Sequence, residues 1–235
     1  MIDRRFWIRW TLIAITTCTA VVLLVGWGLY AVGARDFPDN LSPAAWHASP
    51  GLRQQYLAAE NIDPAGMPRL NPVTVWYHVF RDNDRRQALP MQPRSRLQLL
   101  LNAARVVSLR ESPMDREGGR YLLRDPALMT HISRNWTPDD MVDTILAESG
   151  YARDVRGFDA AAQFYFQLPA KDLRPQESLA LIALLRGPSW YDPVCHRDRF
   201  EQLYAQLAQR VGGRGPAWTS AIALARLRAH DCPGA

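Results

Sequence analysis

Lysine is almost missing from this sequence. Lys171 is the single lysine among 28 basic residues, so arginine carries nearly all of the positive charge behind the formal net charge of +5. Guanidinium groups stay protonated at any working pH. The excess charge is uneven, because the first 35 residues carry a net +3 and the other 200 only +2. No basic groove is indicated, and we do not expect nucleic-acid binding.

Internal repeats and long Gly/Ser linkers are missing as well. The composition, 48% hydrophobic and 22% charged, is typical of a globular chain and excludes disorder as the main state. We therefore expect one folded domain over residues 51–235, preceded by a short proline-containing stalk over residues 35–50.

The longest feature that the sequence does contain is an uncharged run from Trp10 to Ala34, which is 25 residues long. About 20 apolar residues are enough for a helix to cross a membrane. Arg4, Arg5 and Arg9 precede the run, and the positive-inside rule therefore places residues 1–9 in the cytoplasm. The sequence predicts a transmembrane anchor over residues 10–34, with the rest of the chain outside.

Two other interpretations of this run are open. A cleaved signal peptide is one, because the small residues from Ala31 to Ala34 offer cleavage spacing. Secretory apolar cores are usually about 7–15 residues long, however, and this longer run favours the uncleaved anchor. A buried helix of a cytosolic protein would need amphipathic spacing, which is not visible. The first two interpretations both export the domain.

The predicted export determines whether the three cysteines are expected to be paired. Cys18 lies in the predicted span, whereas Cys195 and Cys232 would meet an oxidising compartment, where thiols tend to pair. We expect a disulfide between them. Zinc is the weaker alternative, because His196 and His230 lie close by in the sequence but no Cys-x-x-Cys accompanies them.

Helical patterns dominate the exported part. Apolar residues recur every three or four positions after Pro93, and Thr137-Pro138-Asp139-Asp140 combines a hydroxyl cap, an early proline and two acids at a helix start. Further helices are expected near residues 157–169, 175–185, 200–207 and 218–229. Residues 73–80 are β-branched and aromatic and predict a strand, with a buried helix as the alternative. The expected fold is mainly α.

Five segments stand in an informative order in the second half of the chain. They are Thr137-Pro138-Asp139-Asp140-Met141-Val142, Gly157-Phe158-Asp159-Ala160-Ala161-Ala162, Tyr165-Phe166, Pro169-Ala170-Lys171-Asp172-Leu173 and Pro188-Ser189-Trp190-Tyr191-Asp192-Pro193. Together they resemble the carboxyl-terminal part of the family 51 glycosyltransferases, the peptidoglycan transglycosylase domains of penicillin-binding proteins and their monofunctional relatives.

The resemblance implies a lysozyme-like helical domain, held by one amino-terminal helix on the periplasmic side of the bacterial inner membrane. It also implies polymerisation of lipid II into glycan strands. In that chemistry one carboxylate is the general base for the acceptor hydroxyl. A second acid, basic groups and sometimes a divalent cation stabilise the pyrophosphate leaving group. The sequence contains no ligand cluster for such a cation.

Carried over by position, the resemblance implies Glu60 as the general base and Asp125 or Glu117 as the second acid. Each has a simpler interpretation as well. Glu60 would be a solvated residue near a helix end, and Asp125, which precedes Pro126, would be a helix cap.

The same comparison implies Arg120, Arg124 and Lys171 as groups that bind the substrate. Arginine suits a diphosphate, because its planar fork donates two parallel hydrogen bonds. For Lys171 an ion pair with Asp172 or with a neighbouring residue is the structural alternative.

Several catalytic motifs of the family are missing. Glu60-Asn61 stands where a Glu-Asp pair is expected, and Ser95-Arg96-Leu97-Gln98 replaces a Gly-Ser-Thr-Ile-Thr-Gln-Gln motif. The first alternative to an active transferase is therefore an inactive domain that binds lipid II, glycan strands or a cell-wall synthase. The other is a lytic enzyme with a lone catalytic glutamate.

Overall fold

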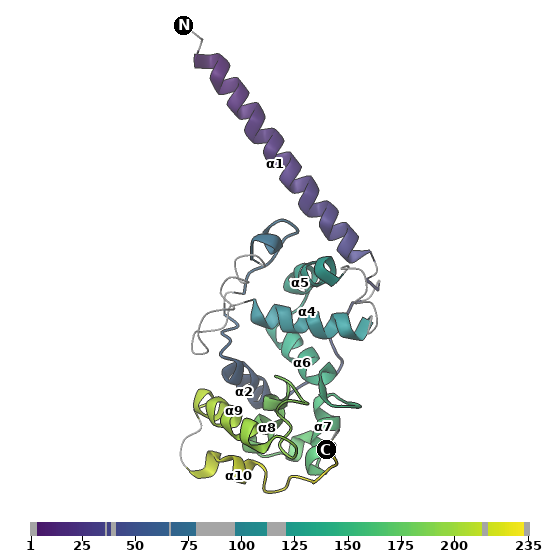
Figure 1. Ribbon diagram of the computed structural model, residues 1–235. Helices are drawn as coiled ribbons and strands as arrows, with labels where there is room; N and C mark the ends of the chain where they lie inside the picture. Colours follow the sequence, from purple (N-terminus) through teal and green to yellow (C-terminus); the bar gives the residue numbers. More distant parts are fainter. Residues whose placement is uncertain are drawn as a thin grey trace.

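The computed structural model describes residues 4–35, 37–38, 41–65, 67–78, 97–111, 121–212 and 216–232. It is mainly helical, as the sequence predicted. One long helix, α1 (Arg4–Ala34), projects from a bundle of shorter helices (Figure 1).

Within α1, residues Ile8–Ala34 are apolar and long enough to cross a membrane by length and composition. Most of its side chains are exposed, as a lipid-facing helix requires. The hydroxyls of Thr16 and Thr19 donate to the backbone carbonyls four residues earlier, which satisfies these polar groups within the helix. At its carboxyl-terminal end, α1 packs against α5 (Tyr121–Asn135).

The remaining elements follow in chain order. They are α2 (Pro50–Glu60), α4 (Gln98–Glu111), α6 (Pro138–Glu148), α7 (Phe158–Phe166), α8 (Pro175–Leu184), α9 (Arg197–Arg210) and α10 (Ser220–Ala223), with the short 3-10 turns η1 (Ala170–Asp172) and η2 (Pro216–Trp218). A small antiparallel hairpin joins β1 (Gly150–Ala152) to β2 (Val155–Arg156).

The bundle has two ends. In Figure 1, α5 and α4 lie nearest to α1, α6 lies below them, and α7, α8, α9 and α10 form the far end. The central helix of that far end is α8, whose residues 177–184 are all buried. It packs against α2, α7, α9 and α10, and this explains why its residues 179–184 are all apolar.

Two helices begin as their sequences predict. The side chain of Thr137 accepts a hydrogen bond from Asp140 N, and the Asp140 side chain accepts one from Thr137 N, which completes a capping box before Pro138. Ser49 caps α2 in the same manner by accepting from Leu52 N.

The strand predicted over residues 73–80 is wrong. Residues 74–78 are helical, and 79–80 lie outside the described residues. The cause is Asn71, whose side-chain oxygen accepts hydrogen bonds from Val73 N and Thr74 N. With Pro72 next to it, Asn71 forms a helix start, where the sequence pattern had indicated a turn before a strand.

Two further sequence predictions need correction. The helix expected over residues 218–229 ends at Ala223, because the chain that follows is fastened to other elements; Arg228 N, for example, donates to Tyr165 O. Asp125 is not a helix cap. Helix α5 begins at Tyr121, so Asp125 and Pro126 lie inside it.

Gly157 connects the hairpin to α7 with a backbone that only glycine adopts readily. Its φ is +89°, and a β-carbon there would lie 2.6 Å from the carbonyl oxygen of Ala147. We predict that Gly157→Ala lowers the free energy of unfolding by about 1–3 kcal/mol, through backbone strain and this contact. Denaturant unfolding followed by circular dichroism measures the loss.

The matched control is Gly150→Ala in the same hairpin, where an added β-carbon would have open space. This variant should stay within about 0.5 kcal/mol of the wild type. Equal unfolding curves for the two variants would contradict the prediction.

Candidate functional site

Glu60 is the last residue of α2, and it is buried, with 3% of its surface exposed. Its Oε1 accepts a hydrogen bond from Arg186 Nε at 3.0 Å. Arg186 follows α8, and burial lowers its pKa. Next to this pair, Arg210 of α9 donates to the carbonyl oxygen of Ala59 at 3.2 Å. The solvated glutamate that the sequence allowed as an alternative is therefore wrong.

This environment limits what Glu60 does chemically. A general base must reach the proton that it abstracts at about 2.6–3.2 Å, directly or through one water molecule. The Glu60 carboxylate is instead inside the protein and oriented towards a guanidinium group. Arg186 is also largely buried, and its Nη2 has no hydrogen-bond partner among the described residues.

Two other candidate residues, Asp125 and Arg124, lie in α5. Asp125 and Arg124 are partly buried in its second turn, and Arg124 Nε has no hydrogen-bond partner within the described part of the chain. Glu117 and Arg120 lie outside the described residues. In Figure 1, α5 is at the end of the bundle near α1, whereas α2 is in the opposite half.

Lys171 occupies η1 and is exposed. Across the residues that the structure covers, it forms no ion pair with Asp172.

The segment Pro169-Ala170-Lys171-Asp172-Leu173 follows α7 and therefore presents at the surface a cation that has no ion-pair partner among the described residues.

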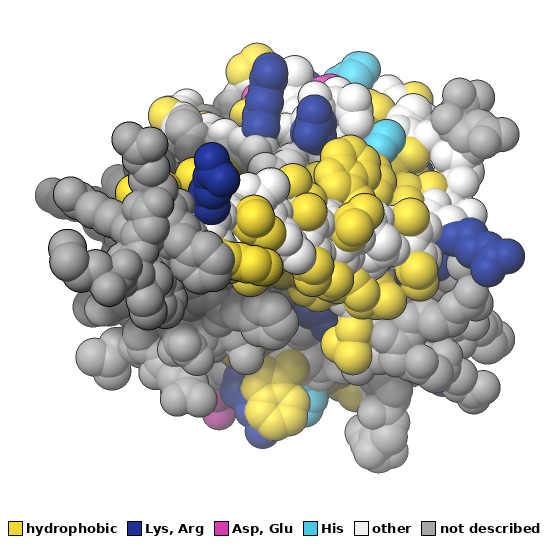
Figure 2. All heavy atoms as spheres, turned by 90° about the horizontal axis from the view of Figure 1, so that it is seen from above, with side chains coloured by type: hydrophobic (Ala, Val, Ile, Leu, Met, Phe, Trp, Pro, Cys, Tyr) yellow, Lys and Arg dark blue, Asp and Glu magenta, His cyan; other side chains and the backbone are white. Residues whose placement is uncertain are grey.

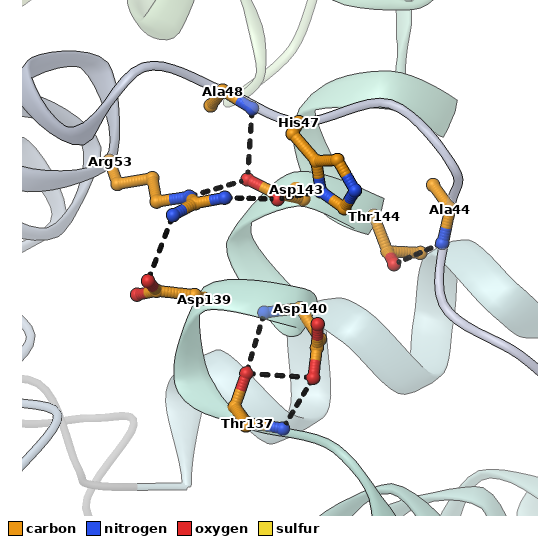
Figure 3. Close-up of polar contacts among 9 residues, drawn as sticks. All are labelled: Ala44, His47, Ala48, Arg53, Thr137, Asp139, Asp140, Asp143 and Thr144. Carbon is orange, nitrogen blue, oxygen red and sulfur yellow. Dashed lines mark hydrogen bonds and ion pairs between the residues drawn. The ribbon is translucent and has the colours of Figure 1, made fainter.

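A polar cluster that the sequence did not reveal is centred on Asp143 of α6 (Figure 3). The side chain of Asp143 is 1% exposed, and Arg53 donates to both of its oxygens, from Nε at 2.8 Å and from Nη2 at 2.6 Å. Ala48 N and His47 Nδ1 also lie within hydrogen-bond distance of the carboxylate, at 3.1 and 3.0 Å. Arg53 Nη1 reaches Asp139 at 2.9 Å.

The cluster fastens the chain before α2 to α6. Ala44 N adds a hydrogen bond to Thr144 Oγ1, at 3.0 Å. Residues 41–48, which fall within the segment expected to be a stalk, thus lie along the domain. The spacing of Asp139 and Asp143, four residues apart on one helix, was the only sequence signal for this cluster.

Electrostatics explain why a buried carboxylate is stable here. Burial by itself would raise the pKa of Asp143, but hydrogen bonds from Arg53, His47 and the Ala48 amide lower it overall. The pKa of Arg53 is raised in return, chiefly by its hydrogen bonds to Asp143. The ionised pair is therefore the stable form of the folded protein.

Stability should depend on pH through this carboxyl group. Its folded pKa lies below the ordinary value of 3.8, so its contribution is complete above that value and is lost as the pH falls towards the folded pKa. We predict that the free energy of unfolding of the wild type decreases between about pH 5 and pH 2, and that Asp143→Asn shows a shallower decrease. Urea titrations at several pH values test this, and parallel slopes would contradict it.

A shallow groove of about 490 Å³ adjoins the cluster on the outer side of α2. Its lining residues are Pro50, Arg53, Gln54, Leu57, Ala58, Ile62, Pro64 and Asp139. The lining does not include Glu60, and its one cation, Arg53, is already engaged by two carboxylates. The groove therefore offers apolar contact and no unpaired acid.

The comparisons with known proteins find one matching segment in the folded domain. Residues 119–211 match the family model described as Transglycosylase. The resemblance predicted from the sequence is confirmed for this segment, which runs from just before α5 to just after α9.

The relatives are penicillin-binding proteins. The chain is 28% identical to penicillin-binding protein 1F of Bacillus subtilis over 32% of its own length, and 33% identical to penicillin-binding protein 1A of Mycobacterium tuberculosis over 30%. It is 29% identical to penicillin-binding protein 1B of Vibrio cholerae over 33%. These matches span 11%, 9% and 10% of the relatives, so the chain corresponds to about a tenth of each.

Proposed function

We propose that this protein works in bacterial peptidoglycan synthesis and that its domain binds lipid II or glycan strands without polymerising them. The helix α1 anchors it in the inner membrane, residues 1–9 lie in the cytoplasm, and the domain lies in the periplasm. The transglycosylase match and the penicillin-binding relatives support the connection to peptidoglycan. The length and apolar character of Ile8–Ala34 support the anchor.

The observation that carries the proposal is the state of Glu60. It is the acid that the resemblance implies as the general base, and here it is buried and hydrogen-bonded to Arg186. Deprotonating a sugar hydroxyl would require this ion pair to open in a site from which water is largely excluded. Breaking a buried ion pair leaves an uncompensated charge, which is costly.

A second line of support is what the chain keeps and what it loses. The segments that resemble the family are largely packing residues: Phe158, Tyr165 and Phe166 are buried in the core. The Gly-Ser-Thr-Ile-Thr-Gln-Gln motif expected near Ser95, with its threonine donors, is absent from the sequence. A fold that keeps its packing and loses its polar donors suits binding better than turnover.

Arg124, together with Arg120, is what we propose for binding the diphosphate of lipid II. Lys171, on η1 beside α7 at the far end of the bundle, is proposed instead for the acidic groups of a glycan strand. Arginine pairs with phosphate through two parallel hydrogen bonds. A cell-wall synthase is a further proposed partner, which the domain would recruit to its substrate.

The test is a lipid II assay with purified full-length protein in detergent, measuring polymer formation and binding in parallel. We expect no polymer from the wild type, and saturable binding of lipid II that Glu60→Gln leaves unchanged. Arg124→Ala should weaken binding by about tenfold, which corresponds to the loss of one charge-assisted contact.

The matched control is Arg197→Ala, an exposed arginine on α9 that pairs with Glu201. It should bind lipid II as the wild type does. Polymer formed by the wild type and lost in Glu60→Gln would overturn the proposal in favour of an active transferase. Release of muropeptides from sacculi would favour a lytic enzyme instead.

A further inference from the structure

The chain after α10 returns across the domain and is fastened beside α7 and α8. Arg226 pairs with the buried Glu177 of α8, and Arg228 N donates to Tyr165 O. The last described residues then meet the loop after α8, where Cys232 forms a disulfide with Cys195. This is the pairing expected from the sequence, with the two Cα atoms 5.5 Å apart.

Two more metal-ligand side chains lie at this disulfide. Asp192 Oδ2 and His230 Nε2 are 2.9 Å apart. The ligand atoms of Asp192, Cys195 and His230 all lie within 4.8 Å of one another. Cys232 belongs to the same cluster, because its sulfur is bonded to that of Cys195. Two sulfurs, one imidazole and one carboxylate are the donor types of a tetrahedral zinc site.

The surroundings hold these groups in position. Asp192 Oδ1 accepts hydrogen bonds from Val194 N at 2.8 Å and Cys195 N at 3.1 Å, and its Oδ2 accepts one from Tyr165 Oη at 3.1 Å. Hydrogen bonds of this kind orient metal ligands in known sites.

The imidazole of His230 packs against two aromatic rings, those of Phe164 and Tyr165, with centroids 5.1 and 5.4 Å away. Its Nδ1 is buried without a hydrogen-bond partner among the described residues. The ring is therefore fixed in place beside the sulfurs, with one nitrogen unused.

We propose that reduction of the Cys195–Cys232 disulfide converts this cluster into a zinc site with Cys195, Cys232, His230 and Asp192 as ligands. A dithiol supplies two electrons and two protons and becomes a disulfide itself, while the S–S bond breaks and leaves two thiols. Zinc then displaces the two thiol protons and binds both thiolates. The carboxyl-terminal tail is thus fastened in both redox states, by a covalent bond in one and by the metal in the other.

Zinc is favoured over harder cations by the donor set. Thiolate and imidazole ligands select zinc and its cobalt substitute, whereas magnesium and calcium prefer oxygen donors. Tetrahedral zinc binds sulfur at about 2.3 Å and nitrogen at about 2.0–2.1 Å, so the two sulfurs have to separate once the S–S bond is broken.

The experiment uses the full chain with Cys18→Ser, so that the only thiols are those of the cluster. The protein is reduced with dithiothreitol, freed of reductant without oxygen, and titrated with cobalt(II). We expect one cobalt per chain with thiolate-to-cobalt charge-transfer absorption, displacement of the cobalt by zinc, and no such absorption in the oxidised protein.

The variant His230→Ala should bind at least tenfold more weakly. The matched control His196→Ala, an exposed histidine next to Cys195, should bind as the wild type does. Zinc should also protect both thiols of the reduced protein from alkylation. The proposal is overturned by the absence of charge-transfer absorption, by equal affinity of the two histidine variants, or by alkylation rates that zinc does not change.

Discussion

Replacing Asp143 with alanine is expected to lower the free energy of unfolding by about 3–5 kcal/mol. The change removes the carboxylate that pairs with Arg53 and leaves this largely buried guanidinium without its main partner. It also leaves the amide of Ala48, a buried residue, without its acceptor. Urea unfolding of the full chain in detergent, followed by circular dichroism, measures the effect.

Asp139 provides the matched control, because it pairs with the same arginine at the surface. Its side chain is 60% exposed, and surface ion pairs contribute about 0–1 kcal/mol. Asp139→Ala should therefore unfold almost as the wild type does. If the two variants lose equal stability, the burial of Asp143 is not what makes its ion pair important.

Loss of the disulfide is the other large effect. The two cysteines are 37 residues apart in sequence, and a cross-link over a loop of this length stabilises a protein by about 3–4 kcal/mol, mainly through the unfolded chain. Cys195→Ser should therefore lower the free energy of unfolding by this amount under oxidising, metal-free conditions. The double variant with Cys232→Ser should lose no more, because the bond is already absent from the single variant.

Cys18→Ser is the control for this series, since Cys18 is a free, exposed cysteine on α1. It should stay within about 0.5 kcal/mol of the wild type. If the double variant unfolds at the same midpoint as the wild type, the disulfide adds no stability. The chain after α10 is then held by its hydrogen bonds and ion pairs alone.

The sequence was most informative where structure depends on neighbouring residues. The capping box at Thr137 was predictable, because its cap, proline and acid stand side by side in the chain. The error at residues 73–80 has the same local origin. Asn71 and Pro72 are common both in turns and at helix starts, and only the hydrogen bonds from Val73 N and Thr74 N decide between the two.

The candidate site was much less predictable, because its contacts join distant parts of the chain. Arg53 and Asp143 are 90 residues apart, and Glu60 and Arg186 are 126 apart. No local pattern shows which arginine a given carboxylate meets. The resemblance to the transglycosylases implied a role for Glu60 as the general base. It did not indicate that Arg186 would pair with this carboxylate.

The contact between α1 and α5 has a mechanical consequence. Gly33, in the last turn of α1, is so close to the carbonyl group of Leu123 that a β-carbon there would overlap with it. Seen from above in Figure 2, the described side chains at the centre of the view are mostly hydrophobic, and basic side chains lie around them. The long helix therefore meets the bundle at a stiff joint instead of a free hinge, and a tilt of α1 would turn the whole bundle with it.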